Sequence, residues 1–199
     1  MPRVLVATHN PGKLREYLTL FQGGTFEITD LTGEGIDAEV SETGSTFVDN
    51  ATLKAVAYST HSPLPVVADD SGLEVDALWG EPGVNSARYA GPDASDQERI
   101  ALLLANLKDV VPEERTARFR AVIAVAEQGR VIGVFEGICE GVITLEPAGG
   151  QGFGYDPVFY VPEMGKTMAE LSMEEKNRLS HRGKAARQAL AFLNEHLAR

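Results

Sequence analysis

Two long apolar segments joined by a short turn constrain the fold of this chain more than any other feature of its sequence. Residues 117–126 and 131–144 are each long enough for an extended strand, and apolar side chains alternate along the first of them. Gln128 and Gly129 stand between the two segments, which is typical of a β-hairpin. Because a hairpin joins antiparallel strands, the chain is not expected to form a purely parallel sheet.

The rest of the chain alternates between short apolar runs and amphipathic helical patterns. Residues 3–7, 25–29, 64–68 and 157–161 predict further strands. One helix is predicted from Phe47, after a polar loop. Others are predicted after four capping residues, namely Asn10 (followed by Pro11), Ser95, Ser172 and Ser180. Strands and helices mixed in this way predict an α/β protein, with a mixed sheet flanked by helices in a single domain over residues 1–199.

Composition and charge disfavour several classes of function. The 199 residues are 43% hydrophobic and 24% charged, as in globular proteins with a buried core. A net charge of −11 at pH 7 disfavours binding to nucleic acid or to an anionic membrane. No apolar run approaches the roughly 20 residues that span a bilayer, and the first residues lack a signal-peptide pattern, so we expect a cytoplasmic protein. The single Cys139 forms neither an internal disulfide nor a cysteine metal cluster.

The segment from Thr8 to Lys13 is the first candidate binding site. It leads from an apolar strand into a capped helix, along which Leu14, Leu18 and Phe21 are predicted to face the core. A helix N-terminus offers unpaired backbone N–H groups and the positive end of the helix dipole, and both suit a phosphate. Lys13 places a cation where the dipole alone favours an anion. An anionic ligand would explain this, although a lysine on a well-capped helix is the ordinary alternative.

Asp69 and Asp70 are candidate ligands for Mg²⁺. They follow the apolar run 64–68 and precede Ser71 and Gly72, so we expect them at the end of a strand beside a turn. Mg²⁺ takes oxygen ligands and is usually bound by one or two carboxylates together with substrate phosphates. Because side chains alternate along a strand, the two carboxylates are expected on opposite faces, with only one of them at the site.

A second acidic region precedes and enters the helix that begins at Phe47. Glu39 and Glu42 lie in the polar loop 30–46, whose length suggests a function. Asn50 and Lys54 are four residues apart and share one face of the helix. This region is a possible source of a second carboxylate for the metal, whereas an exposed polar surface is the more common explanation of such a pattern.

Two later segments offer groups that suit a nucleoside. A glycine-rich run ends in the sequence 153–156 (Phe-Gly-Tyr-Asp), where glycines permit close approach of a ligand and aromatic rings can stack on a base. His181 and Arg182 again place cations in the first turn of a predicted helix, with Lys176 nearby in the sequence. Each segment also has an ordinary structural explanation. Together with the acidic regions, they form the inventory of a nucleotide site.

The chain resembles the inosine/xanthosine triphosphate pyrophosphatase family, the Ham1-like enzymes. The motifs that carry the resemblance run in family order along nearly the whole chain: residues 8–13, 42–47, 50–55, 68–73, 86–89, 153–157 and 180–183. The resemblance implies an elongated α/β fold with a central mixed sheet, two lobes around an active-site cleft, and a homodimer. Asp49 stands where the family usually has glutamate, and we expect its shorter side chain to shift the metal geometry slightly.

The resemblance also implies an activity and a set of site residues. The activity is Mg²⁺-dependent hydrolysis of ITP, dITP, XTP and dXTP to the monophosphate and pyrophosphate, which keeps these nucleotides out of DNA and RNA. Asp70 is implied as the catalytic base and, with Glu42, as a ligand of one or more Mg²⁺ ions. The implied substrate-binding residues are Thr8, His9, Asn10, Pro11, Gly12, Lys13, Lys54, Ser71, Phe153, Gly154, Tyr155, Asp156, Lys176, His181 and Arg182.

Alternatives to this function remain open at the level of sequence. One is a related pyrophosphatase for modified pyrimidines or a broad nucleoside triphosphatase, and another is a non-catalytic nucleotide-binding regulator. For base selection, the candidate donors to the C6 oxygen of hypoxanthine or xanthine, where adenine carries an amine, are Arg182 or the backbone N–H groups at the start of the Ser180 helix. The irregular segment 80–92, with Trp79, Val84 and Tyr89, is expected to contribute to the homodimer.

Overall fold

The computed structural model describes residues 1–198, which separate into two compact units. Unit 1 comprises residues 1–70, residues 121–137 and the segment from His181 to the end of the described chain. Unit 2 comprises residues 71–120 and 138–180. Both units are therefore discontinuous in sequence, and whether they unfold as the single domain expected from the sequence stays a prediction.

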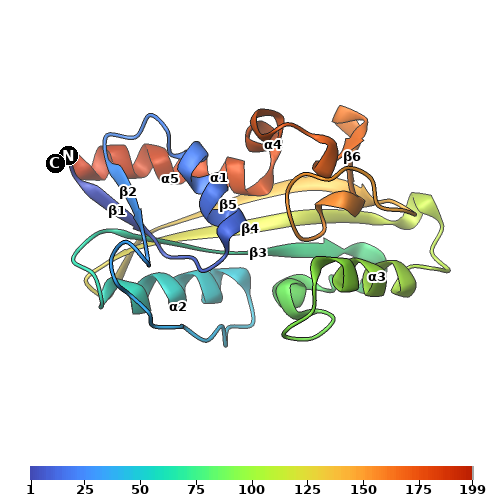
Figure 1. The fold of residues 1–199 in the computed structure, drawn as a ribbon, viewed down its shortest axis with the longest axis horizontal. Coiled ribbons are helices and arrows are strands. Elements are labelled where there is room, and N and C mark those ends of the chain that lie inside the picture. Colours follow the sequence, from blue (N-terminus) through green and yellow to red (C-terminus); the bar gives the residue numbers. More distant parts are fainter. Residues whose placement is uncertain (199) are drawn as a thin grey trace. The chain divides into compact units, whose positions relative to one another are not determined.

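The strands form a mixed sheet, as predicted (Figure 1), and their order in it is β2-β1-β3-β4-β5-β6-β7. The pairs β1·β2 and β1·β3 are parallel, whereas β5·β6 and β6·β7 are antiparallel. Three of the four boundaries between the units fall inside β3, β4 and β5, and the fourth lies between Ser180 and His181. The strands are β1 (Arg3–Val6), β2 (Glu27–Asp30), β3 (Val66–Val75), β4 (Thr116–Glu127), β5 (Arg130–Ile143), β6 (Phe159–Val161) and β7 (Lys166–Thr167).

All the predicted helices are present, and most begin at the predicted caps. Unit 1 contains α1 (Pro11–Leu20), α2 (Phe47–Ser59) and α5 (His181–Leu197), and unit 2 contains α3 (Asp96–Asn106) and α4 (Met173–Leu179). Side-chain oxygens at four N-caps accept hydrogen bonds from backbone N–H groups of the first turn, namely those of Asn10, Thr46, Ser95 and Ser172. These caps explain why local sequence predicted where the helices begin.

The core of unit 1 shows which face of the sheet each side chain of β3 occupies. Val4 and Val6 of β1 and Val67 of β3 pack with Tyr17 of α1 and with the alanines of α5. Helices α1 and α5 lie on this face of the sheet in unit 1, and α2 lies on the other (Figure 1). Because side chains alternate along a strand, Asp69 faces the α1/α5 side with Val67, and the next residue faces α2.

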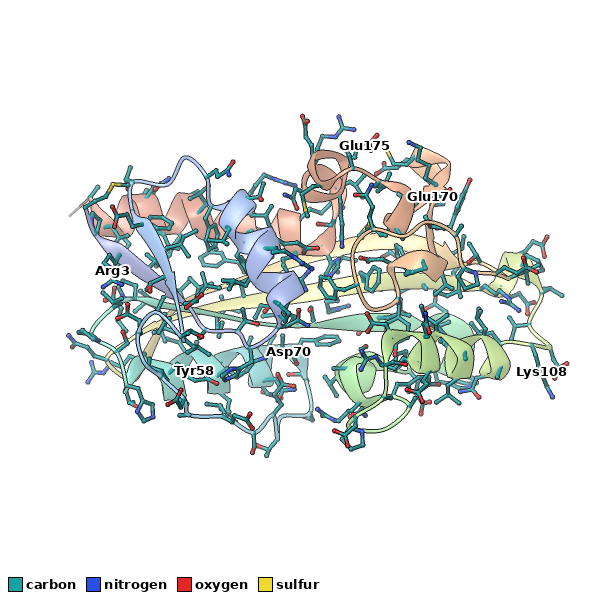
Figure 2. The ribbon with its side chains drawn as sticks, in the orientation of Figure 1. Arg3, Tyr58, Asp70, Lys108, Glu170 and Glu175 are labelled. Carbon is teal, nitrogen blue, oxygen red and sulfur yellow. The ribbon has the colours of Figure 1, made fainter. Side chains whose placement is uncertain are left out.

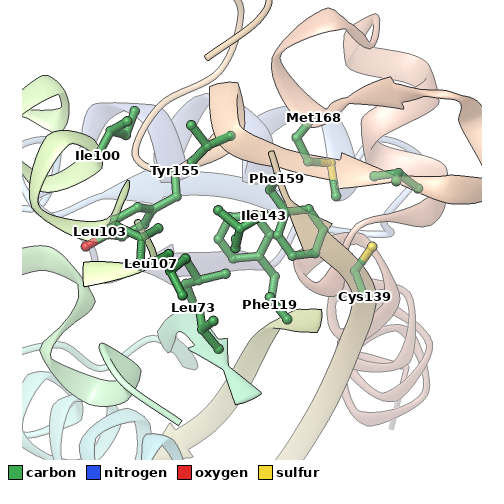
Figure 3. Close-up of a cluster of buried hydrophobic side chains, with 14 of the residues drawn as sticks. Leu73, Ile100, Leu103, Leu107, Phe119, Cys139, Ile143, Tyr155, Phe159 and Met168 are labelled. Carbon is green, nitrogen blue, oxygen red and sulfur yellow. The ribbon is translucent and has the colours of Figure 1, made fainter. Parts of the chain in front are cut away.

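Unit 2 has a hydrophobic core of its own (Figure 3). Aromatic rings from two strands meet in it, with the ring centroids of Phe119 and Phe159 4.3 Å apart. Leu103 of α3 and Met168 pack into the same cluster, as does Tyr155. Helix α3 therefore buries one face in this core, and the tyrosine of the glycine-rich run is a core residue through its ring.

Two sequence predictions about local structure are wrong. Leu18 was expected in the core, but it is 48% exposed, and α1 instead buries Glu16 and Tyr17. A charged side chain on the buried face is stable here because it pairs with Arg182, as described below. The segment 69–72 was expected as a turn, but β3 continues through it to Val75. A strand tolerates two consecutive aspartates at this point because both carboxylates have partners.

The hairpin that anchored the fold prediction is present. Strands β4 and β5 are hydrogen-bonded neighbours joined by Gln128 and Gly129, whose φ angles of 49° and 77° are left-handed. Positive φ at both central residues is the geometry of the two-residue turn that matches the twist of a hairpin. None of the helices among residues 1–198 has the length and apolarity needed to cross a membrane.

Candidate active site

Asp69 lies at the centre of a buried network of charges in unit 1. Its Oδ2 is 3.1 Å from Nζ of Lys13 and 3.3 Å from Nε of Arg182. Nη1 of Arg182 also donates to Glu16 over 2.6 Å, and the residues of this second pair are each 2% exposed. Helices α1 and α5 are therefore linked by the ion pair between Glu16 and Arg182, and both helices also contribute a cation to Asp69 of β3.

The pKa values of this network follow from burial and from the charges around each group. Burial alone would raise the pKa of Asp69, but Lys13 and Arg182 more than offset it and hold that pKa well below its usual range. Burial would lower the pKa of Arg182, and the carboxylates of Glu16 and Asp69 raise it above its usual value. Burial lowers the pKa of Lys13 despite the attraction of Asp69. Asp69 is thus a structural anion, held in its charged form.

Asp70 faces the opposite side of β3 and has a different environment (Figure 2). Its Oδ2 accepts a hydrogen bond of 2.9 Å from Nδ2 of Asn50, a fully buried residue of α2. Oδ1 of the same amide accepts one of 2.8 Å from the backbone N of Gly44. Burial raises the pKa of Asp70, as does the nearby charge of Glu42, while Lys54 and Lys13 oppose the shift. Asp70 is therefore the more basic of the two carboxylates.

Gly44 has no room for a side chain at its contact with α2. A Cβ there would lie 2.5 Å from Cβ of Asp49 and 2.7 Å from Oδ1 of Asn50. Asp49 itself is exposed, and its carboxylate accepts a hydrogen bond from the backbone N of Thr46 in a capping box. Asp49, which stands where the family usually has glutamate, therefore takes part in the N-terminal cap of α2.

The acidic loop before α2 is held against that helix by polar contacts. Glu42 forms an ion pair with Lys54 of α2. The hydroxyl of Tyr58 donates to the backbone oxygen of Ala38 over 3.1 Å, and Nε2 of His9 is 3.1 Å from the same hydroxyl. The predicted residues His9, Glu42 and Lys54 are thus brought into one region of unit 1, where charges from the loop, α2 and β3 interact.

The carboxylates of this region suit a magnesium ion that binds together with a phosphate-bearing ligand. The negative charge of Glu42 is close enough to raise the pKa of Asp70, and a cation bound by both carboxylates would relieve this repulsion. Within residues 1–198, no three His, Cys, Asp or Glu side chains gather as a metal-binding group. Such a group is not required, since Mg²⁺ commonly takes one or two carboxylates and completes its shell with phosphate oxygens and water.

The backbone N–H groups at the start of α1 are already satisfied, contrary to the sequence expectation. Oδ1 of Asn10 accepts from the backbone N of Gly12 at 2.8 Å and of Lys13 at 3.0 Å. Pro11 has no N–H group, and the backbone N of Asn10 donates to Oγ1 of Thr8. An anion near this end of the helix would therefore be attracted by the dipole and by the Lys13 ammonium.

The glycine-rich run forms a second polar cluster, located in unit 2. The backbone N of Phe153 donates to Oδ2 of Asp156 over 2.9 Å, and Lys176 pairs with the same oxygen. Nζ of Lys176 also lies 5.0 Å from the centroid of the Phe153 ring, in a cation–π contact. Gly152 has a φ of +79°, and a Cβ on it would lie 2.0 Å from that same Asp156 oxygen. We call residues 152–156 the glycine loop.

The structure divides the predicted site residues between the two units. Unit 1 contains the residues around β3 and α1, which we call the charged cluster: Thr8, His9, Asn10, Lys13, Glu42, Lys54, Asp70, His181 and Arg182. Unit 2 contains Lys176 and the glycine loop, together with Ser71, which follows Asp70 on β3. His181 and Arg182, which were grouped with the nucleoside pocket, thus belong to the unit that contains Lys13.

Sequence reasoning missed Glu16, and it left the partner of Arg182 undetermined. The cation in the first turn of α5 was expected to need an anion, and Glu16 and Asp69 supply two. The only local signal was that Glu16 follows Gly12 by four residues, on the face of α1 that is buried. A contact of Arg182 with a purine base therefore stays a prediction, while its contacts within unit 1 are part of the fold.

Comparisons with known proteins cover nearly the whole chain. A model of the Ham1 family matches residues 4–192. A protein of Geobacillus kaustophilus (strain HTA426) named dITP/XTP pyrophosphatase is 55% identical over 185 residues, which cover 93% of this chain and 91% of that protein. A protein of the same name from Bacillus subtilis (strain 168) is 46% identical over 193 residues, covering 97% and 98% of the two chains.

Solved structures match the fold as well as the sequence. The structure of a HAM1 protein from Coxiella burnetii superposes with a TM-score of 0.88 at 42% identity, covering 98% of this chain and 100% of that chain. A structure from Mycobacterium abscessus, described as a nucleoside-triphosphatase and dITP/XTP pyrophosphatase, gives a TM-score of 0.74 at 45% identity and covers 96% and 98% of the two chains.

Proposed function

The chain belongs to the Ham1 family, and from this premise we propose that it hydrolyses non-canonical purine nucleoside triphosphates to the monophosphate and pyrophosphate. The substrates are ITP, dITP, XTP and dXTP, and removing them keeps damaged purines out of DNA and RNA. The observation that carries the proposal is near full-length identity of about one half to proteins named dITP/XTP pyrophosphatase. The charged cluster and the glycine loop supply the groups that this reaction needs.

The triphosphate is the part of the substrate assigned to the charged cluster. Lys13, Lys54 and the positive end of α1 offset its negative charges, with Thr8 and the Asn10 amide as further donors. Oδ1 of Asn10 is used in the cap, and its amide nitrogen is the donor we assign to a phosphate oxygen. Ser71, next to Asp70 on β3, is assigned to the phosphates as well.

Hydrolysis proceeds by attack of water on the α-phosphorus. The bond from the water oxygen to phosphorus forms, and the bond from phosphorus to the oxygen that bridges to the β-phosphate breaks. Asp70 accepts the proton of the water, a role that suits a carboxylate whose pKa burial has raised. Lys13 and Lys54 stabilise the pyrophosphate that leaves. Asp69, held in its charged form, orients the Lys13 ammonium.

Glu42 and Asp70 are the residues we assign to Mg²⁺, through their carboxylate oxygens. When bound, the ion supplies positive charge that offsets the charge of the triphosphate and of the leaving pyrophosphate. The Asn50 side chain makes two hydrogen bonds that position these residues. Its amide nitrogen donates to the Asp70 carboxylate, and its amide oxygen accepts from the backbone N of Gly44, which lies two residues from Glu42. Its role is to keep both carboxylates in place when substrate is absent.

The purine is assigned to the glycine loop. The half-buried Phe153 ring offers a stacking surface, and Lys176 holds that ring and Asp156 together. Tyr155 anchors the loop through its buried ring. We extend the assignment to His181 and Arg182 as determinants of base preference. A substrate panel of ITP, XTP, GTP, ATP and modified pyrimidine triphosphates separates this function from a broader triphosphatase and from a regulator that only binds nucleotides.

The setting and assembly of the enzyme belong to the same proposal. Nucleoside triphosphates are a cytoplasmic pool, and we place the protein there. We propose a homodimer that binds its nucleotide substrate. We also propose that it binds neither nucleic acid nor membrane, since its net charge of −11 disfavours contact with these anionic partners.

Product analysis tests the proposed reaction directly. Incubation with dITP or XTP and Mg²⁺ is expected to give monophosphate and pyrophosphate in equal amounts, and chelation of the metal is expected to stop it. Asp70→Asn keeps the size and most hydrogen bonding of the side chain, and kcat is expected to fall at least about 100-fold. Orthophosphate with a diphosphate product would contradict attack at the α-phosphorus, and an unchanged kcat would remove Asp70 from catalysis.

A further inference from the structure

We propose that Asp96, the first residue of α3, is a positioning residue that fixes the glycine loop in the geometry needed for purine binding. The proposal rests on the assignment of the loop to the purine in the proposed function. Asp96 acts through the backbone of Gly154 and does not itself touch the substrate. The observation behind it is that one carboxylate contacts the loop and a second segment of unit 2 at the same time.

The contact with the loop is a short charge-assisted hydrogen bond. The backbone N of Gly154 donates to Oδ2 of Asp96 over 2.7 Å, across 58 positions of sequence. Gly154 has a φ of +62°, a left-handed conformation that side chains disfavour, and a Cβ on it would meet no atom within 4 Å. The loop here is therefore not held by packing of its own side chain, and the hydrogen bond to Asp96 supplies the restraint.

The other oxygen of the same carboxylate is also held. Arg99, one turn further along α3, pairs with Oδ1 of Asp96 and donates to the backbone oxygen of Ala87. Ala87 belongs to the short 3-10 helix Gly83–Arg88. The hydroxyl of Tyr155 donates over 2.8 Å to the backbone oxygen of Ser86 in that helix. Two consecutive loop residues, Gly154 and Tyr155, are therefore tied to α3 and to the segment that Arg99 holds against it.

The residue before Gly154 has separate contacts. Phe153 is restrained by the backbone hydrogen bond to Asp156 and by the cation–π contact with Lys176. The residue whose ring we assign to stacking is thus held by Asp156 and Lys176, and the next residue, Gly154, is held by Asp96. Since the Asp96 side chain is 42% exposed, the contact is not explained by packing of the core.

Loss of the anchor is expected to weaken substrate binding more than it slows the chemical step. A loop that is in its binding geometry only about a tenth of the time lowers apparent affinity about tenfold, because apparent Kd is divided by the competent fraction. The atoms that react are assigned to the charged cluster, in which Asp96 has no part. Asp96→Ala is therefore expected to raise KM for ITP and XTP about tenfold with kcat changed less than about twofold.

The experiment compares three variants of the full chain. Asp96→Ala removes the acceptor, Asp96→Asn keeps an acceptor oxygen without the charge, and Asp93→Ala removes an exposed aspartate three residues earlier as a matched control. KM and kcat are measured for ITP and XTP by pyrophosphate release. Hydrogen exchange of the loop amides is measured in the same proteins without substrate, and it reports the anchor without reference to activity.

The expected result is faster exchange at Gly154 and a raised KM in Asp96→Ala, with Asp96→Asn closer to wild type and Asp93→Ala unchanged. If Asp96→Ala leaves the exchange rate at Gly154 unchanged, the proposal that Asp96 holds the loop is wrong. Faster exchange with an unchanged KM would overturn the link to substrate binding, as would a fall in kcat that equals the rise in KM. If the wild-type protein does not release pyrophosphate from ITP, the proposed function fails instead, and exchange alone decides whether Asp96 holds the loop.

Discussion

Asp69 and Asp70 are adjacent in sequence, yet they differ in partners, in pKa and in assigned role. Asp69 faces α1 and α5, where Lys13 and Arg182 keep its pKa low. Asp70 faces α2, where an amide is its partner and burial raises its pKa. The period of the strand separates the two carboxylates, and the elements packed on each face then determine their chemistry.

The first prediction at the scale of residues concerns the buried pair of Glu16 and Arg182. Glu16→Gln keeps the shape of the side chain and removes its charge, which takes one carboxylate partner away from the Arg182 guanidinium. Removing one member of a buried ion pair typically costs about 3–5 kcal/mol, and Asp69, which still compensates part of the Arg182 charge, places the expectation at the lower end of that range. We expect the free energy of unfolding, measured by urea denaturation, to fall by an amount in that range.

A matched control for this substitution is Glu27→Gln, since Glu27 is an exposed glutamate of unit 1. Its free energy of unfolding is expected to change by less than about 0.5 kcal/mol, as for most surface substitutions. A change at Glu16 as small as at Glu27 would show that the buried network does not depend on this charge.

At the scale of elements, local sequence decided where helices begin and where the hairpin turns. The capping boxes of α2, α3 and α4 satisfy backbone N–H groups with side chains only three residues away. The end of β3 was not decided locally. Its sequence at residues 69–72 is typical of a turn, and it is extended because neighbouring elements bind both carboxylates.

The turn between β4 and β5 gives a prediction about how a single substitution in it changes stability. Gly129 has a φ of +77°, and a Cβ there would meet only Thr60 at an ordinary contact distance of 3.6 Å. Gly129→Ala is therefore expected to lose about 1–2 kcal/mol of stability from backbone strain alone. Gly150→Ala is the control, because that glycine has no positive φ and a Cβ on it would meet no atom within 4 Å. Equal stability of the two variants would contradict the assignment of strain to the turn.

At the scale of the whole molecule, each unit has its own core, but the chain crosses between units inside three strands. No covalent linker of irregular structure marks those three crossings among the described residues. The charged cluster and the glycine loop each belong to one unit, so their internal geometry is set by that unit alone.

The proposed homodimer gives the prediction for the whole molecule. Trp79 is 98% exposed, on a turn before the irregular segment that was expected to contribute to the dimer. Sedimentation at micromolar concentration is expected to show a species of twice 21.4 kDa, and Trp79→Lys is expected to shift it toward 21.4 kDa. Leu145→Lys, at another exposed apolar residue, is the control and is expected to leave the mass unchanged. A wild-type species of 21.4 kDa would rule out the dimer.

The sequence by itself determined the class of fold, the helix starts and the hairpin, because these depend on caps, turns and periodicity read over a few residues. The resemblance to the family rested instead on motifs ordered along nearly the whole chain. Tertiary structure decided which carboxylate is the structural anion, why α1 buries Glu16, and what restrains the glycine loop. Those outcomes depend on partners far along the chain, such as Arg182 for Glu16 and Asp96 for Gly154. Burial and long-range charge pairing are properties of the assembled fold, so no local pattern encodes them.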